Sequence, residues 1–333
     1  YYLNNFFMQQ HKLEIKGKNF FVRGYTTNED GGQSYDMLFA GININRAWKD
    51  DKTWFGQYAG AYIGATLAGQ NPENAHIAAR NTADTGRLIP GTAAFNAAFN
   101  KVIADPDVRT GSKLVDNSRI YHSDANYNFA DLIEFAEIQV GGSFREYQLN
   151  SQGRIYTDKD GPINYSEYGA YTQITKKLID DRLKFTGSMR YDKAQNFDGN
   201  ISPRASLVYS GGESRRHNFR GSFQTGFRNP TTQDQYIGFN VGSAVLIGSA
   251  PDNLTRFSEV RGNNIDGSGT ISAFGQAVLE SNTVVLTGLN AYNNSYTATS
   301  VGQFSATGNA ALLRKTNVDY VKPEQVKAFE LGY

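Results

Sequence analysis

Apolar and polar residues alternate along much of the chain. In 218–228 the odd-numbered positions hold Phe219, Gly221, Phe223, Thr225 and Phe227, and the even-numbered positions are mainly polar. Because successive side chains of a β-strand point to opposite sides of the sheet, this pattern predicts a strand with one apolar and one polar face. The same argument predicts nine strands, at about 3–15, 19–27, 119–129, 136–147, 164–178, 183–191, 201–210, 218–228 and 324–333.

The connections between these strands sort by length. The connections after the first, third, fifth and seventh strands are short, at roughly 16–18, 130–132, 179–182 and 211–216. The connections after the second, fourth, sixth and eighth strands include every long one, and they are 28–117, 150–162, 196–199 and 229–323. Tight turns at one end of a sheet and long loops at the other are typical of outer-membrane barrels. A soluble β-sandwich or propeller also alternates, but neither gives a reason for this sorting. We therefore predict an all-β fold, an antiparallel transmembrane β-barrel segment of about nine strands.

The first long connection, 28–117, carries helix signals. Ser34 can cap a helix that runs to Trp48, and Asp51 can cap a second helix through Tyr62. Asn71 and Pro72 are typical of the start of a third helix, which Gly86 would end. Thr92 can cap a fourth helix over 93–104. These signals predict a helical extracellular insert. Two of these segments could instead form a pair of strands, because an even number of added strands leaves the direction of all later strands unchanged. This alternative stays open.

The second long connection, 229–323, is rich in Gly, Asn, Ser and Thr, with scattered aromatic residues. This composition predicts a long extracellular loop. Its low charge and high polarity suit a surface that contacts a sugar or a peptide, and they suit a solvated loop equally well.

Composition narrows the classes of function. Mean hydropathy is −0.50, and no apolar run approaches the roughly 18 residues that predict a transmembrane helix. Lys and Arg (33) balance Asp and Glu (32), so no basic field favours nucleic acid as a partner. Cysteine is absent, which excludes disulfides, thiolate metal sites and cysteine nucleophiles.

Candidate chemistry is sparse. The four histidines, at 11, 76, 122 and 217, have no metal-ligand spacing, and we expect His122 to be a hydrogen-bonding residue of the barrel wall. The segment that begins at Asn264 is similar to a calcium loop, but Gly275 stands where a bidentate Glu is required. No nucleophile elbow, phosphate loop or dinucleotide motif occurs. We therefore predict no catalytic, cofactor-binding or metal site, and no enzyme.

Three stretches carry a resemblance to a known family. The first consists of 183–192 together with 201–207. The second is 218–231, which ends in Phe-Arg-Asn-Pro-Thr. The third is 323–333, which reads Pro-Glu-Gln-Val-Lys-Ala-Phe-Glu-Leu-Gly-Tyr. In this order they resemble the barrel of TonB-dependent outer-membrane receptors of the Bacteroidota type, most closely over 118–240 and 322–333. The resemblance implies a 22-stranded barrel around a plug domain, and import of a nutrient (a siderophore, glycan or peptide) across the outer membrane of a Gram-negative cell.

The resemblance also implies partners. These are outer-membrane lipid and the TonB–ExbB–ExbD complex, which would act through an N-terminal region absent from this sequence. We expect 1–333 to be part of one barrel domain, with the plug domain and the remaining strands absent. A surface lipoprotein partner stays open, because the segment before Phe227 departs from the Ala-Ser-Tyr-Gly-x-x-Gly-Asn pattern of many SusC-type importers.

The polar side of the strands supplies the candidate site. Residues there would contact the plug or the substrate, and they are Arg145, Arg190, Arg204, Arg220, Arg228, Glu137 and Gln224, with Asn229 beside Arg228 at the extracellular mouth. A guanidinium at the mouth can bind a carboxylate or phosphate bidentately. Two other functions stay open: a receptor-like barrel that is a structural subunit of a larger outer-membrane complex, and a passive porin, which the large insert disfavours.

Overall fold

The protein is described from a computed structural model that covers residues 1–241, 244–262 and 283–333. Two compact units make up the chain. We call residues 1–8 with 29–117 the insert unit, and residues 9–28 with 118–333 the sheet unit. Among the described residues, no helix is both long enough and apolar enough to cross a membrane.

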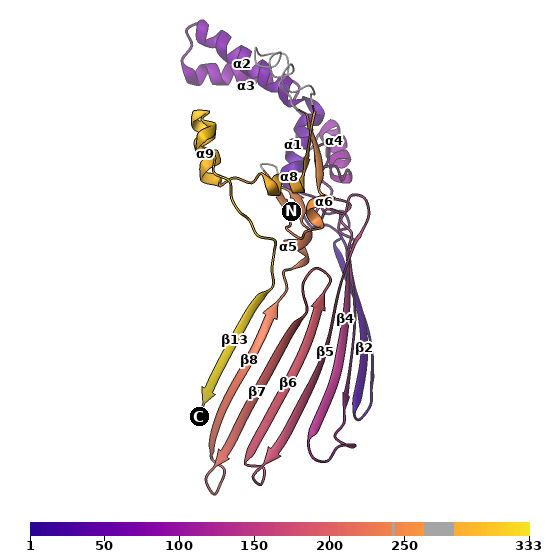
Figure 1. The fold of residues 1–333 in the computed structure, drawn as a ribbon. Helices are drawn as coiled ribbons and strands as arrows, with labels where there is room; N and C mark the ends of the chain where they lie inside the picture. The colour runs from indigo at the N-terminus through magenta and orange to yellow at the C-terminus, as the bar shows by residue number, and fades with distance from the viewer. Residues whose placement is uncertain (242–243, 263–282) are drawn as a thin grey trace. The chain divides into compact units, whose positions relative to one another are not determined.

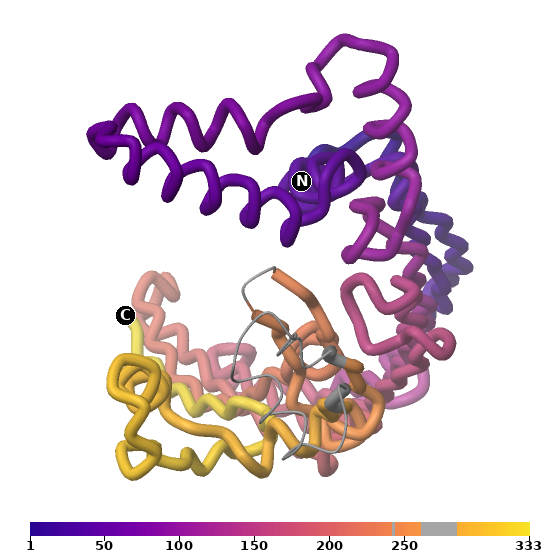
Figure 2. The backbone as a smooth tube through the Cα atoms, turned by 90° about the horizontal axis from the view of Figure 1, so that it is seen from above, coloured from indigo at the N-terminus to yellow at the C-terminus, as the bar shows by residue number. Residues whose placement is uncertain are grey.

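A nine-stranded antiparallel sheet dominates the sheet unit (Figure 1). Its strands, in spatial order, are β1 (Phe7–Lys16), β2 (Phe20–Asp30), β3 (Arg119–Asn128), β4 (Glu137–Leu149), β5 (Ile163–Leu178), β6 (Leu183–Ala194), β7 (Asn200–Gly211), β8 (His217–Arg228) and β13 (Glu324–Gly332). Each strand of this sheet therefore pairs with the member of the sheet that comes before or after it along the chain, and the short strands β9–β12 lie outside the sheet. Viewed along the strands in Figure 2, the sheet follows an open arc.

The predicted nine strands and their order are confirmed. The first strand starts at Phe7 rather than near residue 3, because Tyr2 instead forms a bridge with Tyr35. The turn after β3 is longer than expected and occupies 129–136. The size and closure of the whole barrel stay predictions.

The tight turn between β5 and β6 has an unusual backbone. Ile179, Asp180 and Asp181 all have positive φ, at 54°, 49° and 63°. The turn spans the four residues 179–182 between the paired Leu178 and Leu183. Left-handed backbone is uncommon for residues other than glycine, and aspartate is among those that tolerate it.

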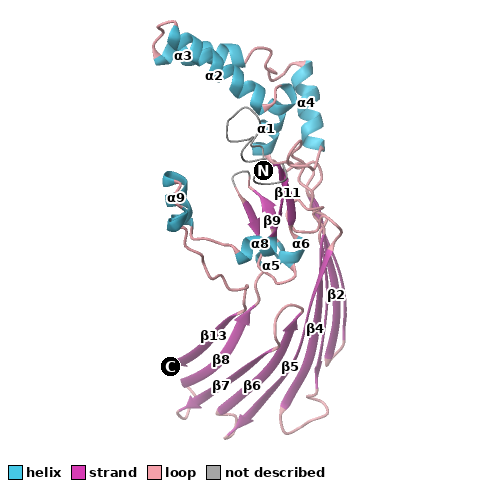
Figure 3. Cartoon of the chain, turned by 45° about the horizontal axis from the view of Figure 1, so that its top comes forward, coloured by secondary structure: helices cyan, strands magenta, loops and turns pink. Residues whose placement is uncertain are grey.

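The segment 229–323 is not the plain loop that its composition predicts (Figure 3). It contains α5 (Thr232–Tyr236), β9 (Gly238–Asn240), β10 (Val245–Ile247), α6 (Asn253–Arg256), β11 (Ser258–Gly262), β12 (Thr283–Thr287), α8 (Gly288–Asn293), α9 (Ala298–Thr307) and the 3-10 turn Ala310–Leu312. Threonine side chains cap three of these helices, from Thr231, Thr287 and Thr297. A Thr-rich composition thus supplied helix caps here instead of irregular chain.

A buried aromatic core lies where β4, β5 and β6 meet α5. We call it the cap cluster, and its members are Leu149, Tyr156, Ile163, Tyr165, Ala194, Phe197, Tyr236 and Ala250. Tyr236 is fully buried, and the Asn196 side-chain amide donates to its hydroxyl at 2.7 Å. Gln235, the neighbour of Tyr236 in the chain, holds the chain at Pro230, because its side-chain amide donates to the Pro230 carbonyl at 2.9 Å.

Four helices form the insert unit, which confirms the helical prediction against the strand pair. They are α1 (Met37–Trp48), α2 (Asp51–Leu67), α3 (Pro72–Ala83) and α4 (Ala93–Ala104). Asn71 and Thr92 cap α3 and α4 as expected. The caps of α1 and α2 are Asp36 and Asp50 rather than Ser34 and Asp51.

Helix α2 contains glycines that its own unit does not require. A Cβ added at Gly56, Gly60 or Gly64 would meet nothing within 4 Å. Glycine inside a helix costs about 1 kcal/mol relative to alanine. We therefore expect Gly60→Ala and Gly64→Ala each to stabilise α2 by about 1 kcal/mol, measured as slower hydrogen exchange of its amides in the full-length protein.

The matched control is Gly69→Ala. Space is equally open there, but Gly69 has a φ of +83°, which a Cβ disfavours. This variant should lose stability. Faster exchange in Gly60→Ala would contradict the prediction and would mean that a further segment packs on the glycines.

Asp84, at the end of α3, joins α3 to α2. Its carboxylate accepts a hydrogen bond from the Trp54 indole N–H at 2.9 Å and one from Arg80 Nε at 3.1 Å. Burial acts to raise the pKa of the Asp84 carboxyl, but the Trp54 and Arg80 interactions outweigh it, and the pKa lies below the ordinary value of 3.8.

This pKa gives a pH dependence to the α2–α3 contact. A depressed folded-state pKa stabilises the fold above the ordinary pKa, and that contribution is lost as the pH falls through the lower, folded-state value. We expect the tryptophan emission of the wild type to change below about pH 4. The variant Asp84→Asn should lack this transition, and an identical acid transition in both proteins would contradict the assignment.

Candidate functional site

One face of the sheet carries most of the polar side chains. Directly opposed residues on neighbouring strands share a face, and Arg145 lies opposite His122 on β3 and Glu167 on β5. The same parity places Arg190, Arg204, Arg220 and Arg228 on this side, which we call the polar face. The predicted alternation of sides is therefore correct for all five arginines.

The opposite side, the apolar face, is rich in aromatic and aliphatic residues. Tyr191 pairs with Ile201, and Met189 with Pro203. Tyr168, Met189, Ile201 and Phe219 are all exposed to solvent in the isolated chain. A large exposed apolar surface of this kind requires a non-aqueous or protein environment.

Two ion pairs are fixed on the polar face. Arg23 donates to both carboxylate oxygens of Asp124, at 2.8 and 2.7 Å. Arg190 Nε lies 2.8 and 2.7 Å from the oxygens of Asp192. Bidentate and charge-assisted hydrogen bonds are stronger than hydrogen bonds between neutral groups. The guanidinium groups of these two arginines are therefore already paired with carboxylates of the protein.

Arg145 lies between these pairs and is less completely engaged. Its Nη1 donates to the Tyr147 hydroxyl at 3.1 Å, and its Nε lies 3.4 Å from His122 Nδ1. The nearest carboxylate oxygen, of Glu167, is 3.9 Å from Nη1, which is an ion pair without a hydrogen bond. The Arg145 side chain is 39% exposed, so a guanidinium with unused donors faces solvent.

Two recesses share this part of the polar face. A smaller one, of about 120 Å³, lies between Arg145, Arg190 and Asp192, and a larger one, of about 400 Å³, lies between Arg145, Tyr147 and Thr231. Arg145, Glu167 and Asn229 line both. The Asn229 amide donates to Glu167 at 3.2 Å. The three residues therefore form a common wall.

Glycine makes room for the smaller recess. A Cβ at Gly169 would overlap the Asp192 carboxylate and would lie 2.7 Å from Arg190 Nη2. Gly169 is opposite Asp192 in the sheet, so the Arg190–Asp192 pair can lie flat across β5 only because no side chain stands there.

The loop after β8 positions Asn229. Thr231 and Asp234 form a reciprocal capping box at the start of α5, which satisfies the backbone donors of this short helix. Gln235 and Tyr236 anchor the other end of α5 in the cap cluster. Asn229 is thus held by a rigid element immediately after the strand.

The remaining predicted candidates lie apart from this wall. Arg204 and Arg220 are exposed, and neither has a side-chain hydrogen bond or ion pair within the part of the chain that the structure describes. Arg228 is 74% exposed and pairs with Glu324 at 3.1 Å. The structure therefore brings together Arg145, Arg190 and Asn229 but not the other three.

Other residues of the wall were absent from the predicted set. Glu167 and Asp192 supply its carboxylates, and Tyr147 and Ser143 supply hydroxyl partners of Arg145 and Arg190. His122 does form hydrogen bonds in the wall, as predicted. The alternation of 164–178 already put Glu167 on the polar side, and this signal could have identified it.

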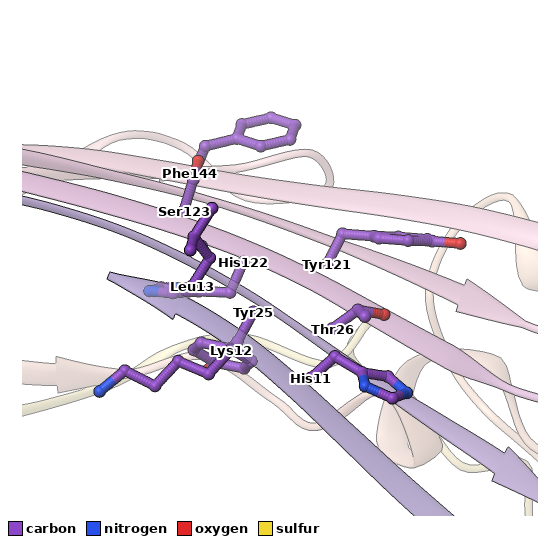
Figure 4. A pocket seen from close by; sticks show the side chains of 10 residues that line it. His11, Lys12, Leu13, Tyr25, Thr26, Tyr121, His122, Ser123 and Phe144 are labelled. Carbon is purple, nitrogen blue, oxygen red and sulfur yellow. The ribbon is translucent and has the colours of Figure 1, made fainter. Parts of the chain in front are cut away.

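A third hollow, of about 450 Å³, lies among β1, β2, β3 and β4 (Figure 4). Its lining takes Tyr25 and His122 from the polar face but Tyr121 and Phe144 from the apolar face. None of the candidate arginines of the polar face lines it, and we assign it no binding role.

Metal-binding clusters are not found in the described residues, where no group of three or more His, Asp or Glu side chains could hold an ion. The calcium-loop-like segment from Asn264 to Gly275 lies outside the described residues.

Comparison with known protein families places the chain. Residues 4–333 match the family described as TonB dependent receptor-like, beta-barrel. No curated protein matches the chain.

Proposed function

This chain belongs to the family of TonB-dependent receptor β-barrels, and from that premise we propose that its polar face lines the import path of a nutrient of the siderophore, glycan or peptide class. Members of this family are transporters of the Gram-negative outer membrane rather than enzymes, and they work with the TonB–ExbB–ExbD complex.

The apolar face supports the orientation in the membrane. Along β6 the positions of Leu183 and Tyr191 differ by eight residues, which corresponds to about 27 Å of strand at roughly 3.4 Å per residue. With a strand tilt of about 40°, the vertical span is about 21 Å, which covers most of the height of about 25 Å expected for the apolar band of such barrels. Outer-membrane lipid would contact this face, and the polar face would line the interior.

Arg145 is the observation that carries the proposal. Its guanidinium faces the two recesses, hydrogen-bonds Tyr147 and His122, and meets Glu167 only at 3.9 Å. A carboxylate, phosphate or hydroxamate-like oxygen of a ligand could bind the unused donors without breaking a hydrogen-bonded pair. Arg190 and Asn229 would line the adjoining surface.

Arg204 and Arg220 suit a different role. Both are exposed on the polar face and lack partners among the described residues. In a barrel that holds a plug, unpaired arginines at mid-strand would hydrogen-bond that plug. Arg228, paired with Glu324 across β8 and β13, would stabilise the mouth.

The test is a growth experiment in the source bacterium. The gene is deleted, and growth is compared on iron-siderophore complexes, polysaccharides and peptides supplied as limiting nutrients, with uptake of the labelled nutrient measured in parallel. We expect growth to fail on one class, and the same failure in a strain without TonB.

Unchanged growth on every class would overturn the import proposal. If outer-membrane complexes of the deletion strain then lacked other subunits, the structural role would be the function. A surface lipoprotein that copurifies with the receptor would establish that partner separately.

A further inference from the structure

The insert unit contains a pocket of about 230 Å³ where α1, α2 and α3 meet. Its lining combines three aromatic side chains with charged and amide groups: Asn45, Trp48, Lys49, Asp51, Trp54, Phe55, Arg80, Asp84 and Arg87. Ligand sites are typically concave, largely aromatic and supplied with a few polar groups that fix the ligand. The polar face of the sheet contributes nothing to this pocket.

The aromatic residues of the pocket have different roles. The Trp54 ring stacks on Tyr58 at 5.2 Å and has the Arg80 guanidinium 5.5 Å from its centre, so it forms part of the wall. Phe55 contacts the Trp54 ring edge-on at 5.0 Å but is 64% exposed. Lys49 Nζ lies 4.5 Å from the centre of the Trp48 ring. Phe55 and the second side of Trp48 are therefore the available aromatic surfaces.

The strongest charges of the pocket are already neutralised. Arg80 pairs with Asp84 at 3.1 Å, and Asp51 pairs with Arg46 at 2.6 Å. An anionic ligand would have to compete with these carboxylates for their guanidinium groups. Such an exchange of partners yields little net free energy.

Several further polar groups of the pocket have unused hydrogen-bonding capacity among the described residues, although Arg87 attracts the Asp84 carboxylate through space. The Trp48 indole N–H and the Asn45 side-chain amide form no hydrogen bond there, and the Arg87 guanidinium forms neither a hydrogen bond nor an ion pair. Both Arg46 contacts of Asp51 use Oδ2, which leaves Oδ1 as an acceptor. The pocket thus offers both donors and an acceptor beside its aromatic surfaces.

We propose that this pocket binds one ring of a neutral saccharide. A pyranose presents an apolar C–H face, which suits Phe55 and Trp48. Its ring of hydroxyls, each both donor and acceptor, suits the Asn45 amide, the Asp51 oxygen and the Arg87 guanidinium. The pocket volume accommodates a single sugar unit, so an oligosaccharide would bind by one residue.

The proposal does not rest on nutrient import, since a receptor that cannot transport would still bind the sugar. The experiment uses the full-length receptor in detergent micelles, titrated with neutral hexasaccharides of glucose, mannose and galactose, with hexagalacturonate and with a neutral hexapeptide. Both tryptophans of this sequence, Trp48 and Trp54, line the pocket. A change in tryptophan emission on addition of saccharide therefore reports binding in this pocket. Its loss in Trp48→Phe would identify Trp48 as the residue that senses the saccharide.

Phe55→Ala should weaken binding of the neutral saccharide about tenfold, because it removes an apolar contact surface. Arg87→Gln and Asp51→Asn should each weaken it about fivefold through a lost hydrogen bond. The matched control is Leu67→Ala on the same helix, where the side chain is 84% exposed and lies outside the pocket.

Two results would overturn the proposal. One is the absence of any emission change or heat with the neutral saccharides up to about 10 mM. The other is tighter binding of hexagalacturonate or of the peptide than of every neutral saccharide, with the loss of affinity in Arg87→Gln confined to that ligand. Equal effects of Phe55→Ala and Leu67→Ala would place the saccharide elsewhere and would count equally against it.

Discussion

Replacement of Arg145 by alanine in the full-length receptor is expected to weaken binding of the imported nutrient about 100-fold. A hydrogen bond to a charged group contributes about 1.5–3 kcal/mol, and each 1.4 kcal/mol corresponds to roughly a factor of ten in affinity. Arg145 is the guanidinium of the polar wall that lacks a hydrogen-bonded carboxylate. Its loss also leaves Glu167 without the cation nearest to it. Binding of the labelled nutrient to whole cells measures the change.

Two variants sharpen this test. Arg145→Lys keeps the charge but not the planar fork of donors, so we expect a loss of about tenfold. Arg204→Ala removes an arginine from the same face without removing a contact among the described residues, and it should leave affinity unchanged. If Arg145→Ala binds like the wild type whereas Arg204→Ala does not, the nutrient contacts the polar face at mid-strand rather than at the wall.

Replacement of Tyr236 by alanine is expected to open the cap cluster. Tyr236 is fully buried and meets Tyr165 in an edge-to-face contact with ring centroids 6.0 Å apart. Removal of a buried aromatic side chain costs about 3–5 kcal/mol. Because cleavage follows the population of the open form, proteolysis within 150–162 or 229–257 should accelerate by roughly two orders of magnitude or more. Mass spectrometry of timed digests measures these rates.

The conservative variant Tyr236→Phe keeps the packing and loses the hydroxyl, which accepts the bond from Asn196 and also interacts with Asp252. A hydrogen bond of this kind contributes about 1 kcal/mol, so cleavage should accelerate only about fivefold. If Tyr236→Ala and Tyr236→Phe were cleaved equally fast, the hydroxyl rather than the packing of the ring would hold the cap cluster together.

The strands could be predicted because their signal is local. Alternation with period two depends only on neighbouring residues, and it placed β5 and β8 within one residue of their observed bounds. The cap of α1 could not be predicted in this way. The Ser34 hydroxyl, a good cap by type, instead accepts a hydrogen bond from the backbone N–H of Asn4 at 3.1 Å, and Asp36 caps the helix. That choice depends on a contact between residues thirty positions apart.

The short helices of 229–323 were missed for a related reason. Helices α5 and α6 have five and four residues, too few to show a helical period. Tertiary contacts stabilise them, as the buried Tyr236 and Leu254 show. Composition alone therefore could not distinguish this segment from a solvated loop.

For the candidate site, the sequence predicts on which face of the sheet each residue lies. It does not predict which residue of the next strand lies opposite. Alternation places Arg145 and Glu167 on the same side, yet their pairing depends on the register of β4 and β5. A connection of the length of 150–162 does not fix register, whereas a tight turn does. Sequence reasoning therefore identified three members of the wall without showing which carboxylates they would meet.

The strand order has a consequence for how the sheet assembles. Short connections join consecutive strands from β3 to β8, so the residues that must pair are close in the chain. Contacts between residues close in sequence form quickly, and we expect β3 to β8 to pair rapidly. The steps from β2 to β3 and from β8 to β13 instead pair Asn28 with Arg119 and Arg228 with Glu324. Closing such gaps costs chain entropy that grows with the length of free chain. Early folding of 29–117 and 229–323 would shorten both gaps, so a defect in either segment should first appear as a slower rate of barrel assembly.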